Sequence, residues 1–272
     1  MEFFLIKQEF RKNFLNVLPN IIEITENRVA VAAIDEEGNI LGCISYILSD
    51  MEYIIDWLYV EATVRRKGVG TSLIKEVINA VTYTGLVYPI VARFEYSSDN
   101  TELYSFFSSI EMMSTEYSHD RYYLNAQNLK DATAIHSKSD ASKGLVMFFD
   151  LPEVVQRKII DELAANGSYY VADYKKWKNQ CEQPLCRCIY SNNSLIDLII
   201  IQRLSDGNLE LSYLYSKNPK GLLKLLAATV SSLENDYPDT ELSFDVVNEG
   251  SGILAEHLFL EARVVPIYEA LY

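Results

Sequence analysis

The residues with the clearest capacity for chemistry are Arg65-Arg66-Lys67-Gly68-Val69-Gly70, in which three cationic side chains run into two glycines. The run lies between an apolar stretch, 53–61, and a helical pattern. Glycines that open a helix directly after a strand leave unpaired amides at the positive end of the helix dipole. Such a turn binds anions, above all phosphate, and cationic side chains strengthen the binding. The other interpretation is a glycine turn that carries a solvated basic cluster.

The spacing of these glycines differs from that of the common nucleotide-binding loops. There is no GxxxxGK[ST], and GxGxxG is absent because Leu73 occupies the place of the third glycine. The motif present has the form [RQ]-x-x-G-x-G after a strand that ends in Leu58-Tyr59-Val60.

The elements that must position this loop follow a regular order in the first half. Strand patterns cover 28–35, 40–48, 53–61 and 86–94, a turn covers 36–39, and a last strand ends at 122–124. From Gly68 the apolar residues recur at helical spacing; they are Val69, Leu73, Ile74, Val77, Ile78 and Val81. A second helix is predicted over 100–110, with Asp99 as its N-cap.

The second half repeats that order. Helices are predicted over 151–167, 219–234 and 251–259, and strands over 185–190, 194–204, 209–215, 241–248 and 263–272. A local echo links the copies, because 47–60 and 203–216 place Leu-Ser-Asp and Leu-Tyr at equal separation. The polar segment 126–144 reads as a linker. We therefore predict a first domain over 1–130, a linker over 131–144 and a second domain over 145–272.

The first half resembles the GNAT (Gcn5-related N-acetyltransferase) superfamily. Val60, Arg65, Gly68 and Gly70 fall on the pattern of the family's acetyl-coenzyme A pyrophosphate loop, and the element order over most of 1–125 agrees. The resemblance implies an α/β (α+β) fold of two GNAT-like domains. Each would be a mixed, largely antiparallel sheet with flanking helices, in which the fourth and fifth strands splay apart to admit the cofactor.

The resemblance also implies which residues hold acetyl-CoA. The pantetheine arm would lie along the fourth strand beside Leu58 and Val60. The pyrophosphate would lie on the amides of the loop, and the implied residues are Arg65, Arg66, Lys67, Gly68, Val69, Gly70 and Thr71.

Transfer of an acetyl group to an amine needs a base for the amine and an acid for the departing thiolate. Asp56 is the best candidate base, because it lies in an apolar strand four residues before Val60 and would project from the same face. A carboxylate bound to neighbouring backbone is an equal alternative, and Glu52 is a weaker candidate. Tyr104 stands where the family often has a Tyr that protonates the thiolate, although Ser108-Ser109 replaces the family's Gly-Phe; a tyrosine that only packs a helix is the alternative.

The second copy departs from the loop pattern. Residues 217–221, Lys-Asn-Pro-Lys-Gly, are shorter, and Pro219 removes an amide. We expect a degenerate GNAT-like domain that either shapes the acceptor site or supports the first domain.

Composition restricts the remaining possibilities. The net charge of −14 argues against nucleic acid or an anionic membrane as the main partner. No run reaches the roughly 20 apolar residues of a membrane span. The four cysteines (43, 181, 186 and 188) make no disulfide framework, and C-x4-C-x-C without a nearby His favours buried thiols over a metal site. We expect a reduced, cytoplasmic protein without a metal.

The sequence thus predicts an N-acetyltransferase that moves an acetyl group from acetyl-CoA to a small-molecule or peptide amine. The mechanism would be direct attack with general base and general acid assistance. The alternative is a non-catalytic acyl-CoA-binding or sensor module, because a cofactor loop does not prove chemistry.

Overall fold

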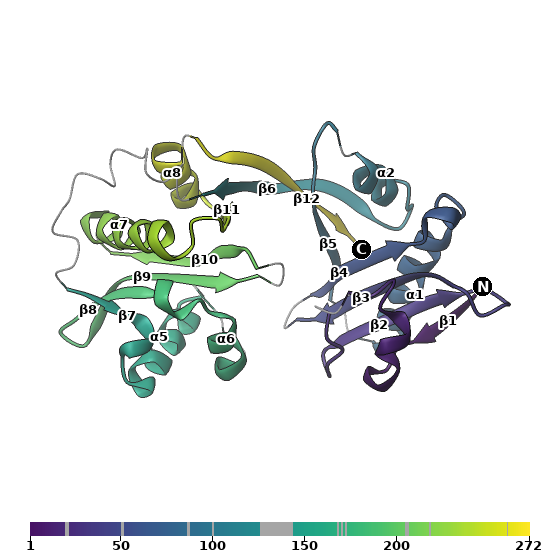
Figure 1. Ribbon diagram of the computed structural model, residues 1–272, viewed down its shortest axis with the longest axis horizontal. Coiled ribbons are helices and arrows are strands. Elements are labelled where there is room, and N and C mark those ends of the chain that lie inside the picture. The colour runs from purple at the N-terminus through teal and green to yellow at the C-terminus, as the bar shows by residue number, and fades with distance from the viewer. Residues whose placement is uncertain are drawn as a thin grey trace. The chain divides into compact units, whose positions relative to one another are not determined.

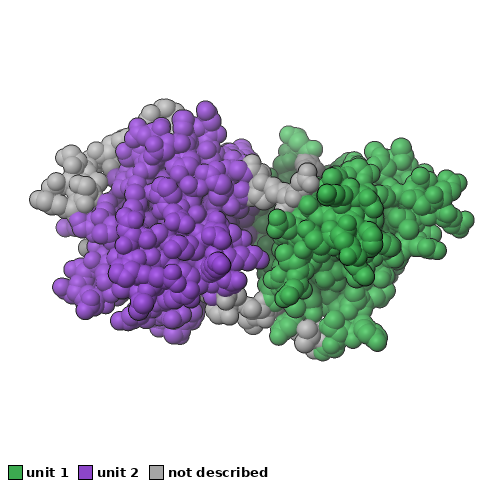
Figure 2. Space-filling model, turned by 60° about the horizontal axis from the view of Figure 1, so that its bottom comes forward, with its two compact units in different colours: residues 1–118, 266–272 green, residues 119–265 purple. Residues whose placement is uncertain are grey.

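The computed structural model describes residues 1–19, 22–49, 52–85, 88–99, 101–125, 144–167, 169, 171, 173–204, 207–217, 219–259 and 261–272. These residues form two compact units, which Figure 2 shows in different colours. The first unit consists of Met1–Ser118 and Pro266–Tyr272, and the second of His119–Val265. No helix among the described residues has both the length and the apolar character of a membrane span.

The first unit is built on a largely antiparallel sheet with the strand order β1-β2-β3-β4-β5-β12 (Figure 1). The strands are β1 (Glu2–Leu5), β2 (Arg28–Ile34), β3 (Ile40–Leu48), β4 (Tyr53–Val60), β5 (Ile90–Glu95) and β12 (Arg263–Leu271). β4 and β5 are parallel and pair only at Tyr53↔Ile90 and Ile54↔Val91. Beyond Ile54 the two strands therefore diverge, as the predicted splay requires.

The helices of this unit are α1 (Val69–Thr84), α2 (Glu102–Ser108) and the 3₁₀ helices η1 (Gln8–Phe14) and η2 (Ala62–Val64). The predicted apolar face of α1 is confirmed, because all six of its residues are buried against one face of the sheet. The alternation along β2 and β3 sends Ala30, Ala32 and Cys43 to the opposite face, where they pack with residues from η1 and from the segment that follows it.

The second unit has the strand order β6-β11-β10-β9-β8-β7. The strands are β6 (Ser114–Leu124), β7 (Leu145–Met147), β8 (Arg187–Ser191), β9 (Ser194–Arg203), β10 (Leu209–Ser216) and β11 (Leu242–Val246). The helices are η3 (Phe148–Asp150), α5 (Glu153–Ala165), α6 (Tyr174–Gln180), η4 (Gln183–Leu185), α7 (Pro219–Asp236) and α8 (Glu249–Leu258). The apolar run in β9 is buried on both faces: Ile199 and Ile201 pack with residues of α7, and Leu198 and Ile200 with residues of α5 and α6 (Figure 1).

The second unit repeats the first at the level of single residues. β4 and β10 both have eight residues, and each carries a bulge at its fourth residue, Asp56 and Ser212. β10 and β11 also pair in parallel only at their first residues, so they splay as β4 and β5 do. The local echo between 47–60 and 203–216 therefore reflects two copies of one fold.

The two halves of the chain exchange a strand. Residues 267–271 of β12 pair with β5 in the first unit, and residues 120–124 of β6 pair with β11 in the second. The compact units thus differ from the predicted domains 1–130 and 145–272, which keep every strand with its own half. The predicted linker 131–144 lies outside the described residues except for Gly144.

One local prediction is wrong. The N-cap of α2 is Thr101 rather than Asp99, and it makes no side-chain cap hydrogen bond. In the second unit, Asp173 caps α6 by accepting from the amides of Lys175 and Lys176.

Candidate functional site

The glycine loop reverses the chain between β4 and α1 by means of two left-handed residues. Gly68 has φ +85° and Arg66 has φ 62°, a conformation that costs a non-glycine residue energy. Gly68 is the N-cap of α1, and it makes no side-chain cap hydrogen bond. The amides of the first turn of α1 therefore have no partner within the helix and stay available to an anion.

A cavity of about 580 Å³ lies against this turn. Its lining comes from β4, the glycine loop, the start of α1 and α2; the residues are Leu58, Tyr59, Val60, Arg65, Arg66, Gly68, Val69, Gly70, Thr71, Glu102, Leu103, Phe106 and Ser109. The volume is within the usual range for small-molecule sites. The cavity combines an apolar wall with a cationic end.

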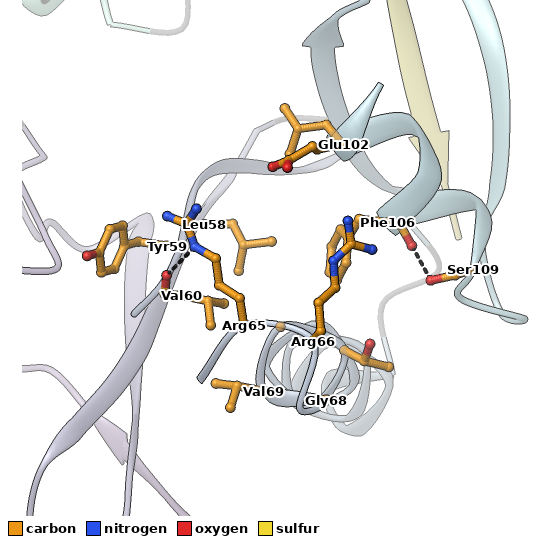
Figure 3. Close-up of a pocket in the computed structure, with 13 residues that line it drawn as sticks. Leu58, Tyr59, Val60, Arg65, Arg66, Gly68, Val69, Glu102, Phe106 and Ser109 are labelled. Atoms are coloured by element: carbon orange, nitrogen blue, oxygen red, sulfur yellow. Dashed lines mark hydrogen bonds between the residues drawn. The ribbon is translucent and has the colours of Figure 1, made fainter. Parts of the chain in front are cut away.

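Both guanidinium groups of the loop extend into the space between β4 and α2 (Figure 3). Arg65 Nε donates to the main-chain oxygen of Val60 at 3.1 Å, which ties the loop to the end of β4. Arg66 extends toward α2, on the side of Phe106. In a chain of net charge −14, these two side chains make the anion-binding end locally cationic.

Gly70 is needed where α1 faces Phe106 of α2. A Cβ at this position would lie 3.0 Å from Phe106 Cε2 and 3.5 Å from Val60 Cγ2. The glycine thus allows the ring of Phe106 to close one wall of the cavity. Around Gly68, in contrast, nothing lies within 4 Å of such a Cβ, so this glycine serves the backbone turn.

Of the residues expected to hold the cofactor, all but Lys67 line the cavity. Lys67 is exposed and is not part of the lining. Sequence reasoning missed Tyr59, Glu102, Leu103, Phe106 and Ser109. The last four share the helical spacing of one face of α2, a signal that was present in the sequence. Tyr59 gave no such signal in the sequence. In the structure its ring points away from the two arginines (Figure 3).

Asp56 lies outside this lining. Ser45 Oγ donates to its Oδ1 at 2.5 Å, and Arg28 forms an ion pair with its Oδ2 at 2.8 Å. The predicted common face of Asp56 and Val60 is wrong, because the bulge at Asp56 breaks the alternation of β4. Asp56 contacts groups on the face of Cys43, whereas Val60 packs on the face of α1.

Glu52 is paired with Arg93 and also lies outside the cavity lining. Both of its carboxylate oxygens accept from Arg93, at 3.0 and 2.9 Å, and Arg93 also bonds Glu269 at 3.2 Å. The hydrogen bond to Glu52 is the main cause of a raised pKa for Arg93.

Tyr104 belongs to an aromatic cluster rather than to the cavity lining. Its ring centroid lies 5.4 Å from that of Tyr96 and 5.3 Å from that of Tyr268, both in edge contacts. Tyr268 comes from β12 and also contacts Phe94 and Tyr117. The position of Tyr104 thus depends on a strand from the far end of the chain.

The four cysteines are buried free thiols. Burial raises the pKa of Cys43 and of Cys188 to about 12. Within the described part of the chain, no group of three or more His, Cys, Asp or Glu side chains is placed to hold a metal ion.

Comparison with known proteins agrees with this geometry. Residues 25–107 match the family model described as an acetyltransferase (GNAT) domain. The match includes β4, the glycine loop, α1 and most of α2, the segments that line the cavity. No curated protein sequence matches the chain.

Solved structures share the fold over nearly the whole chain. A tandem GNAT protein from the clavulanic acid biosynthesis pathway superposes with a TM-score of 0.59 at 10% identity, over 94% of this chain and 85% of that one. A GCN5-related N-acetyltransferase from Sphaerobacter thermophilus gives 0.56 at 10% identity, over 96% and 84%. One from Kribbella flavida gives 0.52 at 14% identity, over 98% and 71%. At these identities the likeness concerns the fold.

Proposed function

We propose, from the GNAT domain in the first unit and the tandem GNAT fold of the whole chain, that this protein transfers an acetyl group from acetyl-CoA to an amine. The first unit would bind the cofactor, and the acceptor would be a small molecule or a peptide. The second unit would bind no cofactor. The observation that carries the proposal is the cavity at the start of α1, with its free amides and two guanidinium groups.

The residues present fit acetyl-CoA. The amides of the first turn of α1 would hold the pyrophosphate, with Arg65 and Arg66 adding charge-assisted hydrogen bonds. Beyond Ile54, β4 has no pairing with β5, so this part of β4 makes no ladder hydrogen bonds to β5 and would bind the amide-containing pantetheine arm there. Leu58, Leu103 and Phe106 supply apolar contact. The cofactor contributes an activated acetyl thioester. The chain must bind the amine, accept its proton and protonate the departing thiolate.

Asp56 is proposed as the general base. Its side chain is 18% exposed, and its two oxygens use one acceptor position each for Ser45 and Arg28. An ionised carboxylate has about four such positions, so Asp56 retains capacity to accept a proton from an amine. Because Asp56 and Val60 lie on opposite faces of β4, the amine would approach from the face opposite the cofactor. The two would meet at the divergent edges of β4 and β5.

Tyr104 is proposed as the acid that protonates the departing thiolate. Its support is its place on α2, the helix whose Leu103 and Phe106 line the cavity. The contacts with Tyr96 and Tyr268 would restrict the ring to a narrow range of orientations.

One observation favours a second function. Asp56 and Tyr104 are both outside the cavity lining and both engaged by neighbouring side chains. A module that binds acyl-CoA without turnover would need neither residue near the ligand. Release of coenzyme A from acetyl-CoA, measured with a thiol reagent in the presence of a panel of amines, separates the two functions. Turnover with any amine supports the enzyme, and binding without turnover supports the module.

Cofactor binding is tested with Gly70→Glu, measured by calorimetric titration of acetyl-CoA. The new side chain would displace Phe106 and place a negative charge at the anion-binding turn, so we expect binding to be lost. Tyr83→Glu is the matched control, since it adds the same charge to the same helix at a residue that is 95% exposed and outside the lining. Equal affinity in both variants would contradict the assignment of this turn.

A further inference from the structure

The helix of the second unit that corresponds to α1 is arranged differently at its start. Residues 61–68 connect β4 to α1, whereas only residues 217–218 connect β10 to α7. The matching positions follow from strand register: Gly42 pairs with Val60 at the end of β4, and Asp197 pairs with Ser216 at the end of β10. A glycine in the first unit is thus replaced by an acidic residue in the second.

Asp197 is fully buried. Ser216 Oγ donates to its Oδ1 at 2.5 Å, while Oδ2 has no hydrogen-bond partner among the described residues. Burying a carboxylate without a counter-charge is costly. A nearby source of positive potential is therefore expected.

That source is the first turn of α7. Gly221 is the third residue of this helix, and a Cβ there would overlap Asp197 Oδ2 and lie 2.7 Å from its Cγ. The carboxylate therefore occupies the space that a side chain at Gly221 would need, directly beside the amide end of the helix. Helix N-termini favour a negative charge at this place.

In the first unit, the glycine lies on the strand rather than on the helix. There the strand residue is Gly42, and a Cβ on it would lie 2.6 Å from the main-chain oxygen of Tyr59 and 3.3 Å from Leu73 Cδ1 of α1. The first unit thus has its glycine on the strand, whereas the second unit has aspartate on the strand and glycine on the helix. Gly221 is therefore explained by Asp197 and not by a cofactor.

We propose that the start of α7 is an anion-binding site that Asp197 fills from within. The second unit carries its own anion at the helix end that, in the first unit, faces the cavity. This built-in carboxylate keeps cofactor phosphate away from the second unit. The proposal does not depend on the acetyl-transfer activity.

The test uses the full chain with Asp197→Asn and Asp197→Gly, and reads melting temperature in sodium chloride and in inorganic pyrophosphate at equal ionic strength. Asp197→Asn keeps the shape and removes the charge, so its melting temperature should fall by roughly 4–8 °C, with no added response to pyrophosphate. Asp197→Gly also leaves space, so pyrophosphate should raise its melting temperature more than it raises that of the wild type. The wild-type response accounts for binding in the first unit.

Two further variants test the fit of the pair. Gly221→Leu alone should lower the melting temperature more than either Asp197 variant, because its side chain collides with the carboxylate. Asp197→Gly combined with Gly221→Leu removes the carboxylate with which the leucine collides, and it should recover most of the loss without any response to pyrophosphate beyond that of the wild type. The proposal is overturned if Asp197→Asn is as stable as the wild type, or if Asp197→Gly gains no more from pyrophosphate than the wild type does.

Discussion

Replacing Arg66 by glycine should weaken cofactor binding and at the same time stabilise the fold. Arg66 is held at φ 62° and extends its side chain into the cavity. A left-handed conformation costs a non-glycine residue about 1–2 kcal/mol. Glycine removes that cost. However, glycine has more conformational freedom in the unfolded chain, which lowers the gain in folding free energy by about 0.5–1 kcal/mol. We expect a net stabilisation of about 0.5–1 kcal/mol, or a melting temperature higher by about 1–4 °C.

Affinity should move in the opposite direction. A hydrogen bond to a charged group contributes about 1.5–3 kcal/mol, so loss of the guanidinium should raise the Kd for acetyl-CoA by a factor of about 10–150. Calorimetric titration measures the affinity, and scanning calorimetry measures the melting temperature. Arg66→Ala should lose similar affinity without the gain in stability, because alanine keeps the unfavourable φ.

Arg65→Gly is the matched control. Arg65 has an ordinary φ of −59°, and its side chain bonds the main chain of Val60. Glycine at this position relieves nothing and removes that bond, so the melting temperature should fall. The reasoning is refuted if Arg66→Gly melts below the wild type, or if its affinity for acetyl-CoA is unchanged.

Asp56→Asn should lower turnover mainly at low pH, where the amine most needs help to lose its proton; wild-type rates at every pH would remove Asp56 from the mechanism. A fragment of residues 1–130 lacks 266–272, leaves the edge of β5 unpaired, and should be poorly soluble and inactive toward the acceptor; full turnover from a soluble fragment would contradict this. Cys43 and Cys188 keep their protons in the folded state, because their pKa rises from 9.0 to about 12. Their contribution to stability is therefore complete below pH 9 and lost as the pH rises toward 12, which urea titrations at pH 8 and pH 11 would detect, whereas a stability that does not fall over that range would contradict it.

The sequence was informative wherever local pattern decides the structure. The helical period from Val69 to Val81 predicted α1 and its buried face, and the glycine spacing predicted the turn that lines the cavity.

Three features were not accessible in this way, because each depends on strand register or pairing. The bulge at Asp56 shifts that residue to the other face of the sheet, and the residue types around it do not predict a bulge. The exchange of β6 and β12 joins residues far apart in sequence, for which periodicity carries no information. The pairing of Asp197 with Gly221 needs the register of two strands before the contact is visible.

The strand exchange also determines when each unit can complete itself during synthesis. The hydrogen bond between Arg93 and Glu269 joins residues 176 positions apart. During synthesis, β5 therefore stays unpaired on the β12 side until all of the second unit has been made. Residues 120–124, in contrast, are already available when β11 emerges. The second unit can therefore close its sheet before the first, although it is encoded later. Until then the first unit has an unpaired strand edge, which makes the nascent chain most vulnerable to aggregation in its N-terminal half.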